Sequence, residues 1–187
     1  MDRIRLTIVI SFTALSIVTN YMLIGVPNVK FMDFIVFIGG FCFGPVTGAL
    51  IGILTWLVYG TLNPYGFVFP IWVTTMFSES LYGIFGGLLG RSHFPINSDE
   101  RWLDMSLLFG VFGFILTFIY DLVTNVVTAF IFELPLLACI ITGLPFTLLH
   151  ELSNVIIFSI GSIPTLKVVR KVIGGDVEYL SSVTNGH

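Results

Sequence analysis

Long apolar stretches, interrupted by short polar or glycine- and proline-rich segments, dominate the pattern of this sequence. An apolar helix needs about 20 residues to cross the hydrocarbon core of a bilayer, and fewer where its neighbours bury its ends. The pattern therefore predicts an all-α, polytopic membrane protein, a six-transmembrane-helix bundle that occupies residues 1–187 as a single membrane domain. The expected spans cover, approximately, residues 6–25, 31–43, 46–60, 70–90, 103–132 and 136–169.

Turn-forming residues separate several of these spans. Gly44 and Pro45 stand between the second and third spans, and the third is followed by the turn-rich loop 61–66. The fifth and sixth stretches are longer than a bilayer requires, so they must tilt, break or project from it. Gly143 and Pro145 are the expected place for a break in the sixth, because proline interrupts the helical hydrogen-bond ladder.

Glycines recur at helical spacing in the middle of the chain. They are Gly44, Gly48 and Gly52 in and before the third span, and Gly83, Gly86, Gly87 and Gly90 at the end of the fourth. Small residues at this spacing let helix backbones approach closely. We therefore expect them to form contact surfaces within the bundle or toward a partner.

The composition agrees with a membrane protein. Hydrophobic residues make up 56% of the 187 residues, charged residues only 10%, and the mean hydropathy is +1.00. Soluble domains normally carry about 25% charged residues. The net charge of -3 leaves no basic surface for nucleic acid. The two cysteines lie in apolar runs and predict neither a disulfide framework nor a zinc cluster.

The distribution of cations predicts the orientation. With the N-terminus in the cytoplasm and six crossings, Lys30 is the one cation expected on the outer side. The positive-inside rule then places both termini in the cytoplasm, and an even number of spans keeps the two basic ends together. The inner cations would be Arg3, Arg5, Arg91, Arg101, Lys167, Arg170 and Lys171.

Several polar side chains occur inside the expected spans. A charged side chain at a helix centre costs about 2.5–3.5 kcal/mol on the translocon scale, so each one should face the protein interior or a wet cavity. Asp33 and Asp104 lie at span ends, where we expect water to reach them. The deeper residues are Glu79, Asp121, Asn125, His150, Glu151 and Asn154.

The deep polar residues share a level in the bilayer. Glu79 lies nine residues in from Pro70, which is about 13 Å at 1.5 Å per residue. The polar residues of the fifth and sixth spans recur every three or four positions and fall in the outer halves of these spans. Three polar stripes at one depth predict an outward-facing small-molecule pocket, with Trp72 one turn further out. Alternatively, the polar groups merely join helix to helix, above all at Asn125.

Catalytic and metal-binding motifs are weak. The run from His150 to Asn154 resembles the zinc-protease motif except at its last position, where a second histidine is required. No Gly-x-Ser-x-Gly elbow and no phosphate-binding Gly-x-x-x-x-Gly-Lys-Ser/Thr loop occurs. We therefore expect no enzyme, no metal and no cofactor, and energy must come from a partner or an ion gradient.

Two parts of the chain resemble a known family. The run 28–35, with Gly39-Gly40 and the run 43–52, is similar to the second and third helices of substrate-binding S components of energy-coupling factor (ECF) transporters. The run 120–125, together with 143–147 and 150–154, resembles their fifth and sixth helices. The six-helix layout and the size agree with the same family.

This resemblance implies a multi-pass subunit of a prokaryotic plasma membrane that captures a vitamin or related micronutrient outside the cell. It also implies docking on an ECF transmembrane coupling subunit that carries two ATPases. The family pocket lies in the outer halves of the fourth to sixth helices, and the resemblance makes Asn63, Tyr65 and Trp72 a lid that stacks on a flat ring. The Ala-x-x-x-Ala docking pair of many members is missing from the first helix, where Ser11, Ala14 and Ser16 stand.

The charges suggest a substrate class. The expected pocket contains up to three acids and one histidine, but no lysine or arginine at its depth. A buried carboxylate needs donors or a cation. The sequence thus favours a neutral or cationic heteroaromatic substrate, such as thiamine or its pyrimidine precursor, over an anionic one.

Two other functional classes remain open. One is a structural or assembly membrane protein of a cell-shape complex, which predicts no stabilisation by a ligand. The other is a self-sufficient secondary transporter, in which Asp121 or Glu79 would carry protons.

Overall fold

A computed structural model describes residues 3–63, 66–92 and 102–184 of the chain. This part contains no strand and confirms the all-α class. Four of the six helices agree with the expected spans to within one residue at both ends, because length and apolar content fixed those boundaries. The helices are α1 (Arg3–Met22), α2 (Met32–Phe43), α3 (Pro45–Thr61), α4 (Phe69–Gly90), α5 (Trp102–Ile131) and α6 (Leu136–Thr184).

Three helices are long and apolar enough to cross a membrane by themselves. They are Arg3–Met22, Trp102–Ile131 and the segment Leu136–Val169 of α6. The helices α2 and α3 are apolar but shorter. The 30 residues of α5 extend about 45 Å at 1.5 Å per residue, which exceeds the hydrocarbon core of a bilayer. The chain is therefore a membrane protein in which long and short apolar helices are combined.

The helices α2, α3 and α4 pack backbone against backbone through glycine. A methyl group added at Gly83 of α4 would collide with the backbone of Gly48 in α3, and one at Gly40 of α2 would collide with Gly83. At Gly86, an added methyl would meet the carbonyl oxygen of Phe37 in α2. The predicted contact surface is thus confirmed within the bundle. The turn from α2 to α3 needs glycine as well, since Gly44 has a positive φ of 92°.

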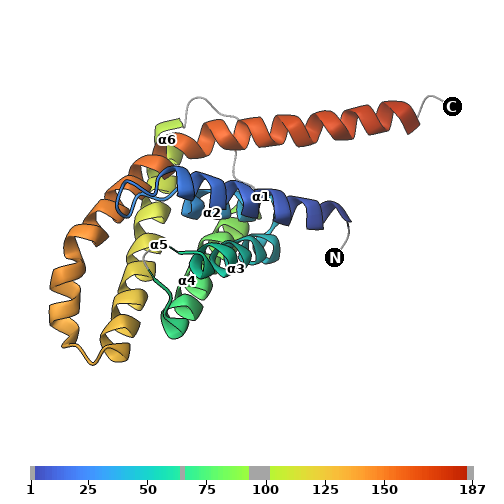
Figure 1. The fold of residues 1–187 in the computed structure, drawn as a ribbon. Helices are drawn as coiled ribbons and strands as arrows, with labels where there is room; N and C mark the ends of the chain where they lie inside the picture. The colour runs from blue at the N-terminus through green and yellow to red at the C-terminus, as the bar shows by residue number, and fades with distance from the viewer. Residues whose placement is uncertain (1–2, 64–65, 93–101, 185–187) are drawn as a thin grey trace.

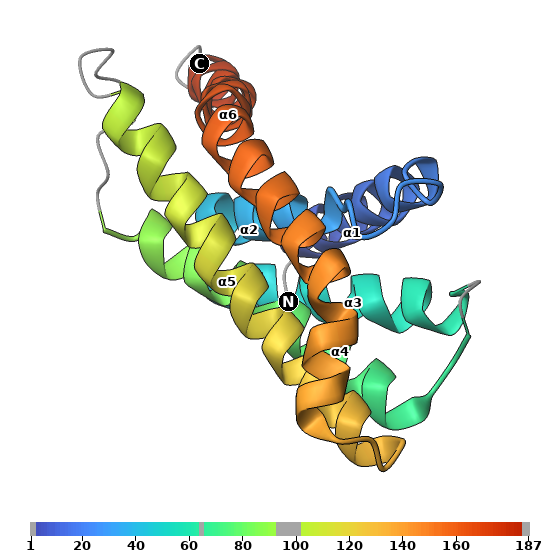
Figure 2. The same cartoon turned by 90° about the vertical axis from the view of Figure 1, so that its left-hand side faces the viewer.

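The helices α5 and α6 form an antiparallel hairpin that packs against α2 and α4. Figures 1 and 2 show the two helices side by side, joined by a short turn, and Figure 2 shows them in front of α2 and α3. The helix α5 also contacts α4, and α6 contacts α2. Gly113 of α5 allows this packing, because a methyl group there would lie 2.9 Å from the ring of Phe158.

The expected break at Gly143 and Pro145 is wrong. The helix α6 continues from Leu136 to Thr184, with Pro145 and Pro164 inside it. Transmembrane helices tolerate proline, because neighbouring helices and small local adjustments satisfy the freed backbone groups. Figure 1 shows instead that α6 bends further along, between the part beside α5 and its C-terminal part.

The helix α2 lies at the centre of the bundle. Ten consecutive residues from Met32 to Phe41 are buried, because α1, α3, α4 and α6 all contact this helix. Its Phe37 ring packs 5.1 Å from Phe158 and 6.0 Å from Phe109, measured between ring centroids. A helix that is apolar on all sides is typical of such a position. Any polar side chain on α2 is therefore placed in the interior.

Candidate functional site

Three charged or ionisable side chains meet in the interior of the bundle. His150 of α6 lies between Asp33 of α2 and Asp121 of α5. Its Nε2 atom is 2.7 Å from Asp33 Oδ2, and its Nδ1 atom is 3.0 Å from Asp121 Oδ1. Ionised carboxylates only accept hydrogen bonds, so with both acids ionised the ring donates through both nitrogens and is positively charged. The imidazole thus links three helices.

An amide and two hydroxyl groups extend this cluster. Asn154 Nδ2 donates to Asp33 Oδ2 and to Thr117 Oγ1, both at 2.7 Å. Tyr82 of α4 donates to the same Thr117 oxygen at 2.9 Å. Asn154 and Tyr82 are fully buried. The cluster therefore includes a fourth helix and consists of buried side chains.

Glu79 is joined to the cluster by charge and to α3 by a hydrogen bond. Trp56 Nε1 donates to Glu79 Oε2 at 3.1 Å, and the Glu79 side chain is fully buried. The carboxyl groups of Glu79 and Asp33 are close enough to interact electrostatically. In the described part of the chain, Glu79 Oε1 and Asp33 Oδ1 accept no hydrogen bond. Unsatisfied buried acceptors are costly, and a proton shared between the two carboxyl groups would satisfy both oxygens.

The expectation that water reaches Asp33 is wrong. Asp33 is fully buried, because the short helix α2 is surrounded by other helices and its first turn lies below the α1–α2 loop. The position of Asp33 at the end of its span did not predict its exposure to water. The apolar character of α2 on all sides is the signal that could have identified Asp33 as an interior residue.

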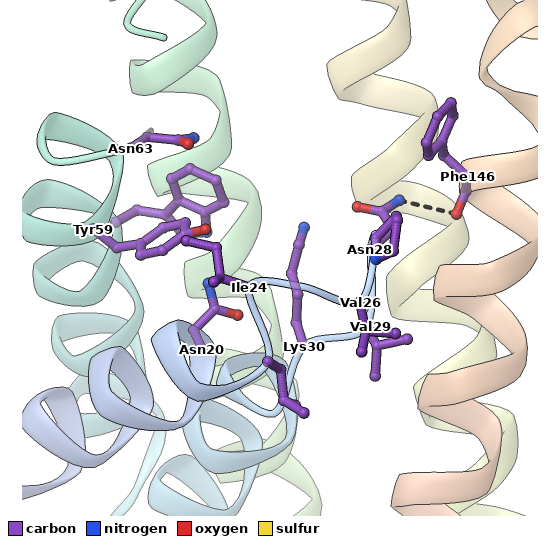
Figure 3. A pocket seen from close by; sticks show the side chains of 12 residues that line it. Asn20, Ile24, Val26, Asn28, Val29, Lys30, Tyr59, Asn63 and Phe146 are labelled. Atoms are coloured by element: carbon purple, nitrogen blue, oxygen red, sulfur yellow. Dashed lines mark hydrogen bonds between the residues drawn. The ribbon is translucent and has the colours of Figure 1, made fainter. Parts of the chain in front are cut away.

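A cavity of about 510 Å³ opens above this cluster, at the end of the bundle where α1 joins α2. Figure 3 shows side chains from α1, the α1–α2 loop, α3 and α6 around it. A hydrogen bond from Asn28 Nδ2 to the Phe146 carbonyl oxygen, at 2.9 Å, joins the loop to α6. The lining residues are Asn20, Leu23, Ile24, Val26, Pro27, Asn28, Val29, Lys30, Trp56, Tyr59, Asn63 and Phe146.

Aromatic rings separate the cavity from the buried acids. Trp56 lines the cavity and also donates to Glu79, so one side chain contacts both. The Lys30 ammonium lies 4.9 Å from the centroid of the Tyr120 ring and 5.7 Å from that of Trp56. Tyr120 in turn packs edge-to-face on His150, with 5.7 Å between centroids. A molecule in the cavity would therefore meet rings and an ammonium group before any carboxylate.

Lys30 contradicts the expectation that no lysine or arginine lies at the depth of the site. The sequence placed Lys30 in an outer loop, and it does belong to the α1–α2 loop. The loop folds inward, however, so that the side chain lines the cavity and acts electrostatically on Asp33 and Glu79. The argument for a neutral or cationic substrate consequently loses its premise.

A second cavity of about 310 Å³ lies beside the first and shares Trp56 and Asn63 with it. Trp72 lines this second cavity and donates from Nε1 to the Trp56 carbonyl oxygen at 3.1 Å. Of the residues expected to form a lid, Asn63 thus lies between the two cavities and Trp72 borders the second. Tyr65 lies outside the described residues.

Asn125 and Glu151 lie outside the hydrogen-bonded cluster, although Glu151 interacts electrostatically with Asp121 and His150. Both line a separate, mostly apolar groove of about 200 Å³ between these helices. The backbone carbonyl oxygen of Asn125 accepts a hydrogen bond from the Cys139 thiol, with 3.6 Å between the sulfur and oxygen atoms. The structure therefore brings Glu79, Asp121, His150 and Asn154 together and leaves these two elsewhere. Neighbouring positions such as His150 and Glu151 point to different sides of a helix, which spacing alone did not resolve.

Sequence reasoning missed Asn20, Lys30, Asp33, Trp56 and Tyr120 as members of the site. None of them belongs to the polar stripes of the last three helices, and four lie in the first half of the chain. No group of three or more His, Cys, Asp or Glu side chains in the described ranges is arranged to hold a metal ion.

The comparison with protein families gave one match. The model of the family described as "ECF transporter, substrate-specific component" matches residues 5–162. Neither the curated proteins nor the solved structures contained a match to the chain. The family match covers most of the chain, including every helix that contributes to the cavity and to the buried cluster. It confirms the resemblance seen in the sequence: the chain belongs to the family of substrate-specific components of ECF transporters.

Proposed function

We propose that this protein captures a small water-soluble vitamin or related micronutrient in the cavity below the α1–α2 loop, for ATP-driven uptake by its partner subunits. Family membership implies association with the transmembrane and ATPase subunits of an ECF transporter. In this proposal the chain acts by binding and not by catalysis, and it docks on one coupling subunit that carries two ATPases. A flat heteroaromatic ring is one substrate group that would suit the rings of Trp56 and Tyr59.

The cavity itself is the observation that carries the proposal. Its volume of about 510 Å³ lies within the range of about 300–1,000 Å³ that is typical of small-molecule sites. Apolar and aromatic side chains line most of it, and a few polar groups converge on it from α1, the α1–α2 loop and α3. This combination supports a binding site, because rings supply contact area while amides and a charge fix orientation.

We further propose six membrane crossings with both termini in the cytoplasm of a prokaryotic cell. Under this topology the α1–α2, α3–α4 and α5–α6 connections face outward. Residues of all three line the two neighbouring cavities, which supports a site open to the outside. A reporter that is active only in the cytoplasm should be active when fused after His187 and inactive when inserted at Gly66. The opposite pattern would reverse the orientation.

A ligand screen tests the function directly. The purified protein in detergent is heated with each of the water-soluble vitamins and their biosynthetic precursors, thiamine included. At a ligand concentration about 100 times Kd, the true substrate should raise Tm by about 5–10 °C. Stabilisation by none of them would favour a structural or assembly protein. Uptake into proteoliposomes that contain this chain alone would favour a self-sufficient secondary transporter.

Replacing Trp56 with alanine should weaken binding of the identified ligand by about tenfold to a hundredfold, since loss of an aromatic anchor costs about 1–3 kcal/mol. Calorimetry on the purified variant measures the change. Trp102→Ala is the matched control, because Trp102 is exposed at the start of α5 and lines neither cavity. Equal affinities of the two variants would remove Trp56 from the site.

A further inference from the structure

We propose that the substrate of this cavity carries a carboxylate group and that Lys30 is the residue that selects it. The inference rests on the proposed function and adds the charge of the substrate. It reverses the preference for a neutral or cationic molecule that the sequence alone suggested.

The charge of the cavity wall comes from Lys30. Among the described residues that line the cavity, no other side chain carries a formal charge, and the remainder are apolar, aromatic or amide-bearing. Within the same part of the chain, Lys30 forms no ion pair with a carboxylate, and its closest described partners are the faces of the Tyr120 and Trp56 rings. The ammonium group therefore has no described carboxylate at salt-bridge distance and only the longer-range attraction of the buried Asp33 and Glu79, so a ligand carboxylate in the cavity would supply a direct partner.

The direction of the side chain supports this role. Figure 3 shows Lys30 extending from the loop into the space between Tyr59 and Asn63 on one side and Asn28 and Phe146 on the other. The amide of Asn20 lies close to the base of the same space, and its side chain is 4% exposed. Asn20 lines the cavity, so its amide group borders the space that a ligand would occupy. A carboxylate at Lys30 would therefore have a second donor nearby.

The buried acids do not prevent an anion from binding. Asp33 and Asp121 share His150 between them, and Glu79 accepts from Trp56. None of the three acids is among the residues that line the cavity, whereas Lys30 and Trp56 are. Lys30 also acts electrostatically on Asp33 and Glu79, so its charge is shared between the buried acids and a ligand. The anion thus meets the ammonium group first.

The test compares pairs of compounds that differ in one charge. Nicotinate and nicotinamide, biotin and biotinamide, and pantothenate and pantothenol are titrated into purified wild-type protein, with thiamine as the cationic probe. We expect at least one carboxylate to bind tenfold or more tightly than its uncharged partner. In Lys30→Gln the carboxylate and its uncharged partner should bind with about equal affinity. The affinity of this variant for the uncharged partner should stay within threefold of wild type. Lys30→Arg should still prefer the carboxylate.

Lys171→Gln is the matched control, since it removes the same charge from an exposed position at the C-terminal part of α6. A residue that only stabilises the fold would change the affinities for both members of a pair alike, so the ratio isolates the role of Lys30. If thiamine or an uncharged compound binds best, or if the preference survives in Lys30→Gln, the inference is overturned and the proposed function stands. If no compound of this set or of the vitamin screen binds to wild-type protein, both fall together.

Discussion

Replacing His150 with alanine is expected to lower the free energy of unfolding by about 3–5 kcal/mol, the cost of removing one partner from a buried charge pair. The imidazole is the group that separates Asp33 from Asp121, at 2.7 Å and 3.0 Å from their oxygens. Without it, two carboxylates face each other in the interior with too few donors. Denaturant unfolding of the purified protein in detergent measures the change.

Glu151→Gln is the control for this substitution. It alters the next residue of α6, which lines the separate groove between α5 and α6 and touches the cluster only through electrostatic interaction with Asp121 and His150, so it should change the free energy of unfolding by less than about 1 kcal/mol. A mutant cycle between His150 and the two aspartates provides a second check. In a background of Asp33→Asn and Asp121→Asn, the loss of His150 should cost about 1–3 kcal/mol less than in wild-type protein. Equal costs in both backgrounds would show that the imidazole is not held by these acids.

Replacing Gly83 with alanine is expected to cost about 3 kcal/mol of unfolding free energy, the upper end of the usual effect of overpacking. The added methyl group would collide with backbone atoms of Gly48. Backbone cannot rotate away as a flexible side chain can, so α3 and α4 would have to separate. The same unfolding assay measures the loss.

Gly25→Ala provides the comparison, because a methyl group at Gly25 meets no atom within 4 Å. This variant should unfold within about 0.5 kcal/mol of wild type. If Gly83→Ala were as stable as Gly25→Ala, the close contact between α3 and α4 at Gly83 would be contradicted. A large loss in Gly83→Ala with unchanged Gly25→Ala would place the contact at the centre of the stability of the bundle.

The helices could be predicted from the sequence because apolar length is a direct physical requirement. Residues 70–90 and 103–132 were expected to be helical, and α4 and α5 begin and end within one residue of these limits. The continuity of α6 through Pro145 could not be predicted in this way, since it depends on neighbouring groups that replace the missing hydrogen bond.

The buried polar cluster beside the cavity was predictable where it depends on residues that a membrane interior does not tolerate alone. Glu79, Asp121, His150 and Asn154 stood out for this reason, and the structure brings them together. Lys30 and Asp33 did not, because their burial results from how a loop and a short helix fit among other helices. Such tertiary placement leaves no periodic signal in the sequence.

The hydrogen bond from Asn28 to the Phe146 carbonyl affects how easily a molecule can enter and leave the cavity. It is exposed and joins two uncharged groups, so it contributes about 0.5–1.5 kcal/mol. Thermal motion breaks a bond of this strength readily. We therefore expect the α1–α2 loop to move away from α6 at little energetic cost. The dissociation rate of a bound molecule would then depend on its contacts with the residues that line the cavity.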